Sequence, residues 1–197
     1  MERAALNGDG IKTMDAFIQK AIRQVNKLTE LIKDLLDVTK IQSGKLIIKK
    51  TEFLLDELIT ECTEELQSSS QKHQLIIEGE TGITIYGDRT RLEQVIINLL
   101  ANAIKYSPNA DKVVINVEKL DEGVKVAITD FGIGIPADKI PLIFDRFYRI
   151  DENSQRYAGL GLGLFISSEI ISQHNGRINI ESKEGAGSTF WFIIPAN

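Results

Sequence analysis

The sequence predicts an α+β fold preceded by one long helix, and three observations lead to this class. A helical stripe of apolar residues spans 88–107, alternating strand patterns occupy 112–119 and 123–130, and a heptad pattern of apolar residues extends over 11–39. The mixture of helices and strands indicates one full domain with an appendage, which suits a chain of 197 residues.

The stretch 88–107 is predicted to be one helix with two different faces. Asn98, Asn102 and Lys105 lie along one ridge of it. Because a buried amide without a partner costs about 1–3 kcal/mol, we expect a polar ligand over this ridge. Amide oxygens suit Mg²⁺ and an ammonium suits phosphate, so a magnesium nucleotide would satisfy all three; the alternative is a ridge that simply faces water. The other face is a predicted core stripe of Leu92, Val95, Ile96, Leu99, Leu100 and Ala103.

Residues 11–44 are predicted to form a long helix that follows a turn at 7–10 and ends at Gly44. Its apolar residues recur in steps of three and four from Ile11 to Thr39, which is the spacing of a coiled coil or a four-helix bundle. One helix cannot bury such a seam alone. We therefore expect a partner helix or a homodimer through residues 11–39; a surface helix packed on its own domain is the alternative.

The rest of the chain alternates between shorter predicted elements. Cys62 lies on the apolar stripe of the second helix, so we interpret it as a small buried residue and not as a nucleophile. The predicted strands are 45–51, 74–78, 83–86, 112–119 and 123–130, with a closing hairpin of 177–181 and 189–195; the predicted helices are 53–70, a short one after Pro136, and 159–174.

Charge and hydropathy exclude two classes of partner. The net charge is -5 and there is no long basic run, so nucleic acid is not an expected ligand. No apolar run approaches the roughly 18 residues that span a bilayer, so no membrane contact is expected from this chain. The single cysteine suits a cytoplasmic setting, whereas membrane anchoring of the parent protein stays open.

Two glycine clusters are typical of close contact with a ligand. Residues 130–135 (DFGIGI) lie at the end of a predicted strand, and residues 159–164 (GLGLGL) open a predicted helix. Glycines let backbone amides approach a ligand, and a helix N-terminus attracts anions. Neither cluster matches a P-loop or a Rossmann fingerprint. A tight turn is the alternative interpretation of each cluster by itself.

The order of these blocks resembles the ATP-binding domain of sensor histidine kinases, a branch of the GHKL superfamily. Residues 98–107, 130–135, 143–149 and 159–164 look like that family's N, G1, F and G2 boxes, and 185–190 looks like its last glycine box. Residues 11–44 look like the second helix of its dimerisation domain. The resemblance implies a two-layer α/β sandwich of the Bergerat type, with a mixed sheet covered by helices on one face. It also implies two regions, a partial dimerisation region at 1–46 and a catalytic domain at 47–197.

The resemblance further implies which residues face the adenine base. Asp130 matches the carboxylate that accepts a hydrogen bond from the adenine amino group, and Tyr106 matches an aromatic residue near the base. Gly132 and Gly134 would let the base lie close. Three further residues of the matching blocks are expected to contact the nucleotide, namely Ile135, Tyr148 and Thr189.

The phosphate side is implied in the same way. Asn102 matches the Mg²⁺ ligand, and Asn98 would support the metal or its waters. Lys105 matches the phosphate-contacting lysine, Arg149 matches the arginine on the γ-phosphate side, and Arg146 is a second candidate. Residues 150–160 would form a mobile lid, whose hinge and phosphate loop would comprise Gly159, Leu160, Gly161, Leu162, Gly163 and Leu164.

The family transfers the γ-phosphate of ATP to a histidine on the first dimerisation helix, for relay to a response regulator receiver domain. That helix is absent here, and His73 and His174 lie in other contexts, with a helix-capping role expected for His174. We therefore expect ATP and Mg²⁺ binding without self-phosphorylation at the usual site. The abrupt start before a complete second helix favours truncation of the phosphoacceptor helix. Leu160 departs from the small or hydroxyl residue that is usual in the family's loop.

Two other functions remain open at this point. ATP-driven switches of the same superfamily place a glutamate base four residues before the metal-binding asparagine, where this chain has Asn98. Glu93 is expected on the opposite side of the helix, so efficient water activation is not predicted. A non-catalytic dimerisation or docking module is supported by the heptad seam alone.

Overall fold

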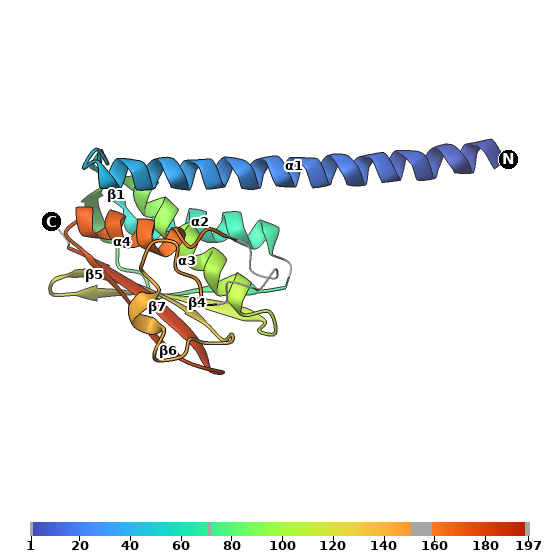
Figure 1. The fold of residues 1–197 in the computed structure, drawn as a ribbon. Coiled ribbons are helices and arrows are strands. Elements are labelled where there is room, and N and C mark those ends of the chain that lie inside the picture. Colours follow the sequence, from blue (N-terminus) through green and yellow to red (C-terminus); the bar gives the residue numbers. More distant parts are fainter. Residues whose placement is uncertain (1, 71, 151–158, 196–197) are drawn as a thin grey trace.

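The computed structural model describes residues 2–70, 72–150 and 159–195. It shows a two-layer α/β body and one long helix, α1 (Glu2–Gln42), which crosses the helical layer and extends well beyond it (Figure 1). Within the described residues, no helix combines the length and the apolar character needed to cross a bilayer.

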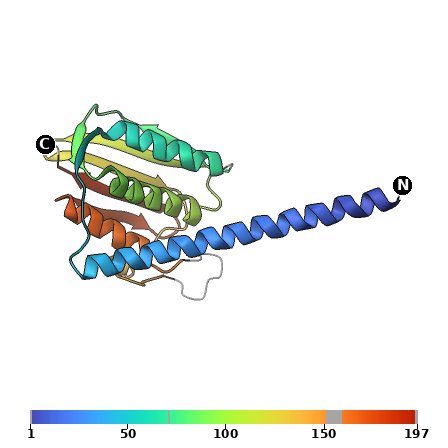
Figure 2. The same ribbon diagram turned by 90° about the horizontal axis from the view of Figure 1, so that it is seen from above.

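A five-stranded mixed sheet forms one layer of the body, in the order β2-β4-β5-β7-β6. β2 pairs with β4 in parallel, and the other neighbours are antiparallel. Three helices cover one face of this sheet (Figures 1 and 2), so the predicted fold class is confirmed. The sheet comprises β2 (Gln74–Glu78), β4 (Lys112–Leu120), β5 (Gly123–Asp130), β6 (Arg177–Lys183) and β7 (Gly187–Ile194), and the helices are α2 (Leu55–Ser69), α3 (Arg89–Tyr106) and α4 (Gly163–Gln173).

Alternation along the central strands decides which residues face the helices. Val124, Val126 and Ile128 of β5 are almost fully buried under the helical layer, and Asp130 continues the same row. In β7 this row is formed by Ser188, Phe190, Phe192 and Ile194. The sheet therefore presents Asp130 and Ser188 together at the end of the helix-covered face.

α1 is longer than predicted, because it runs through residues 7–10, where a turn was expected. A glycine inside a helix costs about 1 kcal/mol relative to alanine but leaves the hydrogen-bond ladder intact. The predicted end is confirmed. Gly44 has φ of +64°, its N–H bonds to the Ile41 carbonyl at 3.0 Å, and the Lys45 N–H bonds to the Lys40 carbonyl at 2.8 Å. These two bonds form a Schellman motif.

The C-terminal part of α1 is fastened to the body by an ion pair. The Asp37 carboxylate accepts from the Arg91 guanidinium of α3 at 2.7 Å and from the Gln94 amide at 3.1 Å. Burial acts to raise the pKa of Asp37, but these two bonds and the Arg91 charge outweigh it, so the pKa is held below its usual value. Val38 is buried beside this pair.

Three other predicted boundaries are wrong. Residues 45–50 form no strand, and β1 (Thr51–Leu54) pairs instead with β3 (Thr84–Gly87). The helix expected after Pro136 is a single 3₁₀ turn at η1 (Ile140–Leu142), since Pro141 has no N–H with which to continue it. α4 begins at Gly163 and not at residue 159, because Gly161 adopts φ of +69°.

Candidate functional site

α3 holds the polar ridge of the candidate site in place. Its first turn is capped by Asp88, whose carboxylate accepts from the Arg91 N–H at 3.1 Å and from the Lys49 N–H at 2.8 Å. Its predicted core stripe is fully buried. Asn98, Asn102 and Lys105 lie on the same helix in half-buried positions. The ridge therefore has little freedom to rotate away from its neighbours.

Asn98 is anchored to the start of α4. Its Nδ2 donates to Ser167 Oγ at 2.9 Å, and its Oδ1 lies 3.5 Å from the Asn102 Nδ2. A Cβ atom built at position 163 would lie 2.3 Å from this Oδ1. A side chain at position 163 would displace the Asn98 amide from this place, and Asn98 links the two helices. Ser167 was not predicted from the sequence, because nothing in the pattern of α4 indicated that it faces α3.

Asp130 is a buried carboxylate at the end of β5, only 4% exposed. Burial raises its pKa, while N–H bonds from Gly132, at 2.8 Å, and from Ser188 oppose the rise. The loop that follows is clamped onto the end of α3. The Ile133 N–H donates to the Tyr106 carbonyl at 3.1 Å, and a Cβ at position 132 would lie 2.1 Å from that oxygen.

The other side of the same loop is locked to the β6–β7 hairpin. The Ile135 N–H donates to Ser182 Oγ at 2.8 Å, and the Gly185 N–H donates to the Ile133 carbonyl at 2.7 Å. Gly134 has φ of +65°, and a Cβ there would lie 2.0 Å from the Lys183 carbonyl oxygen. The loop 130–135 is therefore a preformed feature, held on both sides by backbone contacts that admit only glycine at 132 and 134.

Positive charge gathers at the C-terminal end of α3. Burial lowers the pKa of the Lys105 ammonium, and the charges of Arg149 and Lys27 lower it further. Burial raises the pKa of the Tyr106 hydroxyl, and the Arg149 charge opposes that rise. Lys105 Nζ lies 4.9 Å from the Tyr106 ring centroid and 3.8 Å from where a Cβ of Gly159 would stand. Lys105, Tyr106, Arg149 and Gly159 thus share one region.

The glycine loop before α4 contacts the preceding segment through its backbone. The Phe147 N–H donates to the Gly161 carbonyl at 3.0 Å, and a Cβ at position 161 would lie 2.5 Å from the Tyr148 carbonyl oxygen. Leu162 is buried in the core, while Leu160, Leu164 and Tyr148 pack against it. The side chain of Leu162 therefore belongs to the core, whereas Leu160 and Leu164 are only partly buried.

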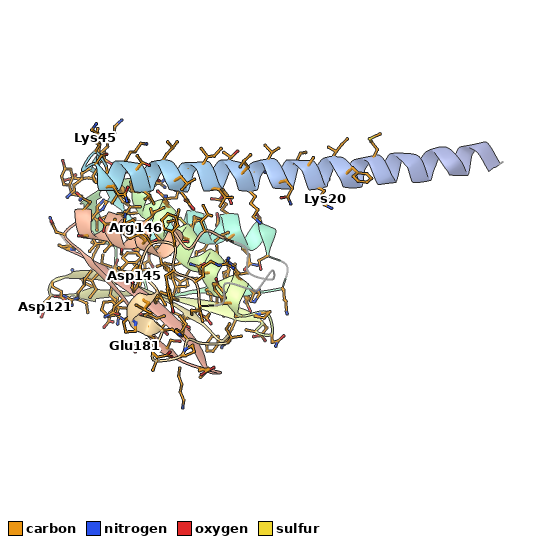
Figure 3. The ribbon with its side chains drawn as sticks, in the orientation of Figure 1. Lys20, Lys45, Asp121, Asp145, Arg146 and Glu181 are labelled. Atoms are coloured by element: carbon orange, nitrogen blue, oxygen red, sulfur yellow. The ribbon has the colours of Figure 1, made fainter. Side chains whose placement is uncertain are left out.

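Two other predicted site residues make contacts of a different kind. Arg146 is exposed, with its guanidinium 5.5 Å from the Phe165 ring centroid (Figure 3). Thr189 lies on the face of the sheet that no helix covers, where its Oγ1 is 2.9 Å from Thr129 Oγ1. Ser188 is the β7 residue beside Asp130, and the two-residue alternation of β7 could have identified it.

The two histidines are structural. His174 Nδ1 donates to the Ile170 carbonyl at 2.7 Å, and its Nε2 accepts from the Asp88 N–H at 2.8 Å. Burial lowers the pKa of His174, in keeping with a neutral ring that caps α4, as predicted. His73 is buried, with Nε2 2.8 Å from the Ser107 carbonyl oxygen.

The predicted burial of Cys62 is confirmed, since the residue is 2% exposed. Burial, and next the charge of Glu93, raises the pKa of its thiol to about 12. Glu93 therefore faces α2, on the side of α3 away from Asn102.

The predicted lid falls mostly on 151–158, outside the described residues. Among the residues that the structure describes, no group of three or more His, Cys, Asp or Glu side chains could hold a metal ion.

Comparison with known protein families identifies the body of the molecule. The family model described as histidine kinase-, DNA gyrase B-, and HSP90-like ATPase matches residues 87–197. The sensor-like histidine kinase SenX3 of Mycolicibacterium smegmatis is 32% identical over 98% of this chain and 51% of its own length. The adaptive-response sensory kinase SasA of Synechococcus elongatus is 33% identical over 91% of this chain and 47% of its own. The chain thus spans about half the length of these relatives.

Solved structures lead to the same family. The catalytic domain of the histidine kinase ThkA is 33% identical, with a TM-score of 0.63 over 75% of this chain and 96% of that one. ThkA in complex with the response regulator protein TrrA matches with 30% identity and a TM-score of 0.69 over 88% of this chain and 49% of that one. The Acinetobacter baumannii histidine kinase AdeS is 26% identical, with a TM-score of 0.70, over 91% and 84% of the two chains.

Proposed function

This chain belongs to the histidine kinase-, DNA gyrase B-, and HSP90-like ATPase family, and from that premise we propose that it is the catalytic ATP-binding domain of a sensor histidine kinase. In this proposal residues 47–197 form the catalytic domain and residues 1–46 are part of a dimerisation region. The reaction is transfer of the γ-phosphoryl group of ATP to a histidine on a dimerisation helix that is not in this sequence.

The observation that carries the proposal is the meeting of three segments at one end of α3. The loop 130–135 is bonded to Tyr106, the glycine loop 159–164 approaches both Lys105 and Asn98, and Arg149 is close enough to influence the pKa values of Lys105 and Tyr106. A buried acceptor, a glycine cradle and a group of cations are the parts that a bound nucleotide needs.

The residues present suit adenine on one side of this region. Asp130 is buried, and its Oδ1 is engaged by the Gly132 N–H, so it is held firmly as a hydrogen-bond acceptor. We propose that it accepts from the adenine amino group, and that Gly132 and Gly134 keep the loop beside it closed against Tyr106 and Lys183. We place Ser188 beside Asp130 in this role and assign none to Thr189.

The residues on the other side suit phosphate and a divalent cation. Lys105 and Arg149 supply positive charge, and the amide oxygen of Asn102 is a hard ligand suited to Mg²⁺. When bound, Mg²⁺ would neutralise charge on the phosphates. Asn98 would position Asn102, since the two amides lie 3.5 Å apart.

In the proposed reaction a nitrogen of the phosphoacceptor histidine forms a bond to the γ-phosphorus, the bond to the β–γ bridging oxygen breaks, and ADP leaves. Catalysis of this step consists mostly of positioning and of charge stabilisation. Lys105 and Arg149 would stabilise the charge that develops on the transferred group. Asn98 is bonded to Ser167 and Glu93 faces α2, so neither is placed as a base for water.

The proposal also names partners and a compartment. ThkA has been solved in complex with a response regulator protein, and we propose a receiver domain as the final phosphate acceptor here too. Exposed apolar residues of α1 between Met14 and Leu36 support a homodimer through residues 11–39. We propose a cytoplasmic location for this region of the protein.

The first test is calorimetric titration of ATP into the chain with and without Mg²⁺. Asp130→Asn is expected to weaken binding by about 1–3 kcal/mol, because an amide can present the wrong group to adenine. Asp121→Asn is the matched control, since Asp121 lies in the β4–β5 turn, away from Asp130 (Figure 3). Equal affinity of Asp130→Asn and the unmodified chain would remove Asp130 from the adenine site.

The second test offers the ATP-loaded chain a separate helical hairpin that carries a phosphoacceptor histidine. Phosphate is expected on the added histidine, and Asp130→Asn should reduce its rate of appearance. Release of inorganic phosphate without transfer would instead support a nucleotide-driven switch. Failure to bind ATP at all would support a docking module.

A further inference from the structure

We propose that Lys27 of α1 contributes to the phosphate-binding region, so that the triphosphate of ATP is held by cations from both the catalytic body and the long helix. This inference rests on the proposed function, because it concerns the nucleotide site. It assigns α1 a direct part in ligand binding, in addition to dimerisation.

Lys27 lies on the side of α1 that packs against the body. Leu31, Asp34, Val38 and Ile41 follow it at intervals of 4, 7, 11 and 14 residues, which at 3.6 residues per turn keeps all of them within about 40° of Lys27 around the helix. Val38 is 5% exposed, Ile41 packs against the core, and the other two are partly buried. Lys27 therefore points to the side of α1 that faces the body.

The relative direction of α1 and α3 brings Lys27 toward the end of α3 that carries Lys105. Asp37 contacts Arg91 near the first residue of α3, and Lys105 lies 14 residues further along that helix. Lys27 lies ten residues before Asp37, a separation of about 15 Å along α1, compared with about 21 Å between Arg91 and Lys105 along α3. Because the helices run in opposite directions (Figure 1), Lys27 comes level with the half of α3 that ends in Lys105.

The charge of Lys27 also acts on Lys105. After burial and Arg149, the charge of Lys27 is the next cause of the lowered pKa of Lys105. The charges of two cations from two other segments thus act on Lys105, at the end of α3 where the glycine loop also lies. Repulsion among like charges opposes such a grouping, whereas a polyanion placed between them would turn repulsion into attraction.

The test compares Lys27→Gln with a matched variant, Lys20→Gln. Lys20 lies one heptad earlier on the same side of α1, in the part that extends beyond the body (Figure 3). Affinities for ATP, ADP and adenosine are measured by calorimetry with Mg²⁺ present, on the complete chain. Lys27→Gln is expected to weaken ATP binding about fivefold, as expected for the loss of one partly screened charge near the phosphates. It should weaken ADP binding less and leave adenosine binding unchanged.

Two further variants and measurements separate ligand contact from structural damage. Lys27→Arg should restore ATP affinity, Lys20→Gln should bind ATP like the unmodified chain, and the melting temperature of Lys27→Gln should be unchanged. Equal ATP affinity of Lys27→Gln and the unmodified chain, or an equal loss in Lys20→Gln, would overturn the role of Lys27 alone. An unmodified chain that binds no ATP would overturn the proposed function together with this inference.

Discussion

α1 and α3 have similar apolar patterns, yet the stripe of α3 is buried and that of α1 is exposed. The stripe of α3 is between 0% and 1% exposed, whereas the large seam residues of α1 are between 45% and 62% exposed, namely Met14, Ile18, Val25, Leu28, Ile32 and Leu35. The difference lies in where the partner surface comes from. α3 finds its partners in α2, α4 and the sheet of the same chain, but the seam of α1 faces away from them.

This contrast shows what an amphipathic pattern does and does not specify. The pattern states that one side of a helix will be buried, and it does not state by what. In α1 a second, shorter stripe around Asp37 and Val38 packs against the body. One side of the helix is therefore buried, and the seam is exposed to solvent.

The largest expected effect comes from truncating the α3 stripe. Leu99→Ala should lower the free energy of unfolding by about 3 kcal/mol, through lost transfer energy and a residual cavity. Leu28→Ala on α1, measured at a protein concentration too low for self-association, should change it by less than about 0.5 kcal/mol. Urea denaturation measures both. Comparable losses would mean that the α1 stripe is already buried within a single chain.

The next effect concerns the ion pair that joins the two regions. Arg91→Met should release the C-terminal part of α1 at a cost of about 1–3 kcal/mol, because Asp37 would be left buried without its cation. Hydrogen exchange of amides in 31–42 should accelerate, while exchange in β5 stays slow. Arg89→Met is the control, since its partner Glu61 is exposed and such pairs contribute about 0–1 kcal/mol. Unchanged exchange in α1 would show that the pair does not hold the helix.

The pKa of Asp37 predicts how this fastening responds to pH. Because its folded pKa lies below the usual value of 3.8, its contribution to stability is present above that value and is lost as the pH falls through the folded pKa. Relative to the intrinsic exchange rate at each pH, lower protection of the amides in 31–42 is therefore expected only under strongly acidic conditions.

A smaller effect is expected from His174, which belongs wholly to the body. Its pKa is lowered in the folded protein, so the unfolded chain binds a proton more readily. Stability should be full above the usual pKa of 6.5 and should fall with decreasing pH until the folded pKa is reached, by at most about 1.4 kcal/mol per pH unit. Thermal denaturation between pH 8 and 5 measures the slope, and His174→Gln should flatten it. An equal slope in the variant would assign the effect to other groups.

A charge placed in the seam is expected to have the smallest effect on the free energy of unfolding. Its effect on self-association should be the clearest. Leu28→Glu should leave the free energy of unfolding nearly unchanged and abolish self-association, because like charges would meet across the dimer axis. Light scattering over a range of concentrations measures this. Asn26→Glu adds the same charge outside the seam and should leave association intact. A monomeric unmodified chain would rule out the proposed dimer.

Much of the body could be predicted because its signals are local. β5 occupies the predicted residues 123–130, since its alternation and its flanking turn agree. The helix predicted at 88–107 is confirmed as well, with Asp88 as its N-cap. The apolar residues at 46–48 favoured a strand, but a strand needs a neighbour to pair with, and the structure provides one only from Thr51 onward.

The candidate site was predicted less completely, because its details depend on long-range contacts. The glycine clusters indicated where the backbone approaches a ligand, but not that Leu162 would be drawn into the core. Thr189 was predicted and Ser188 was not, although the alternation of β7 puts Ser188 in the row that contains Phe190 and Phe192, beside Asp130. The Asp37–Arg91 pair and the Asn98–Ser167 bond join residues that are far apart in the sequence, so no periodic pattern predicts them.

Because α1 has both the exposed seam and the stripe at Asp37 and Val38, its rotation would be transmitted to the body. In the proposed dimer the seam of α1 would pack in a helical bundle, while Asp37 and Val38 contact the body. Rotation of α1 about its own axis would then rotate the body around that bundle by the same angle. A displacement of a few ångströms at the helix surface then becomes a larger arc at the far edge of the sheet. A rotation that begins at the N-terminal end of α1 would thereby change the position of the ATP-binding body relative to the proposed phosphoacceptor histidine.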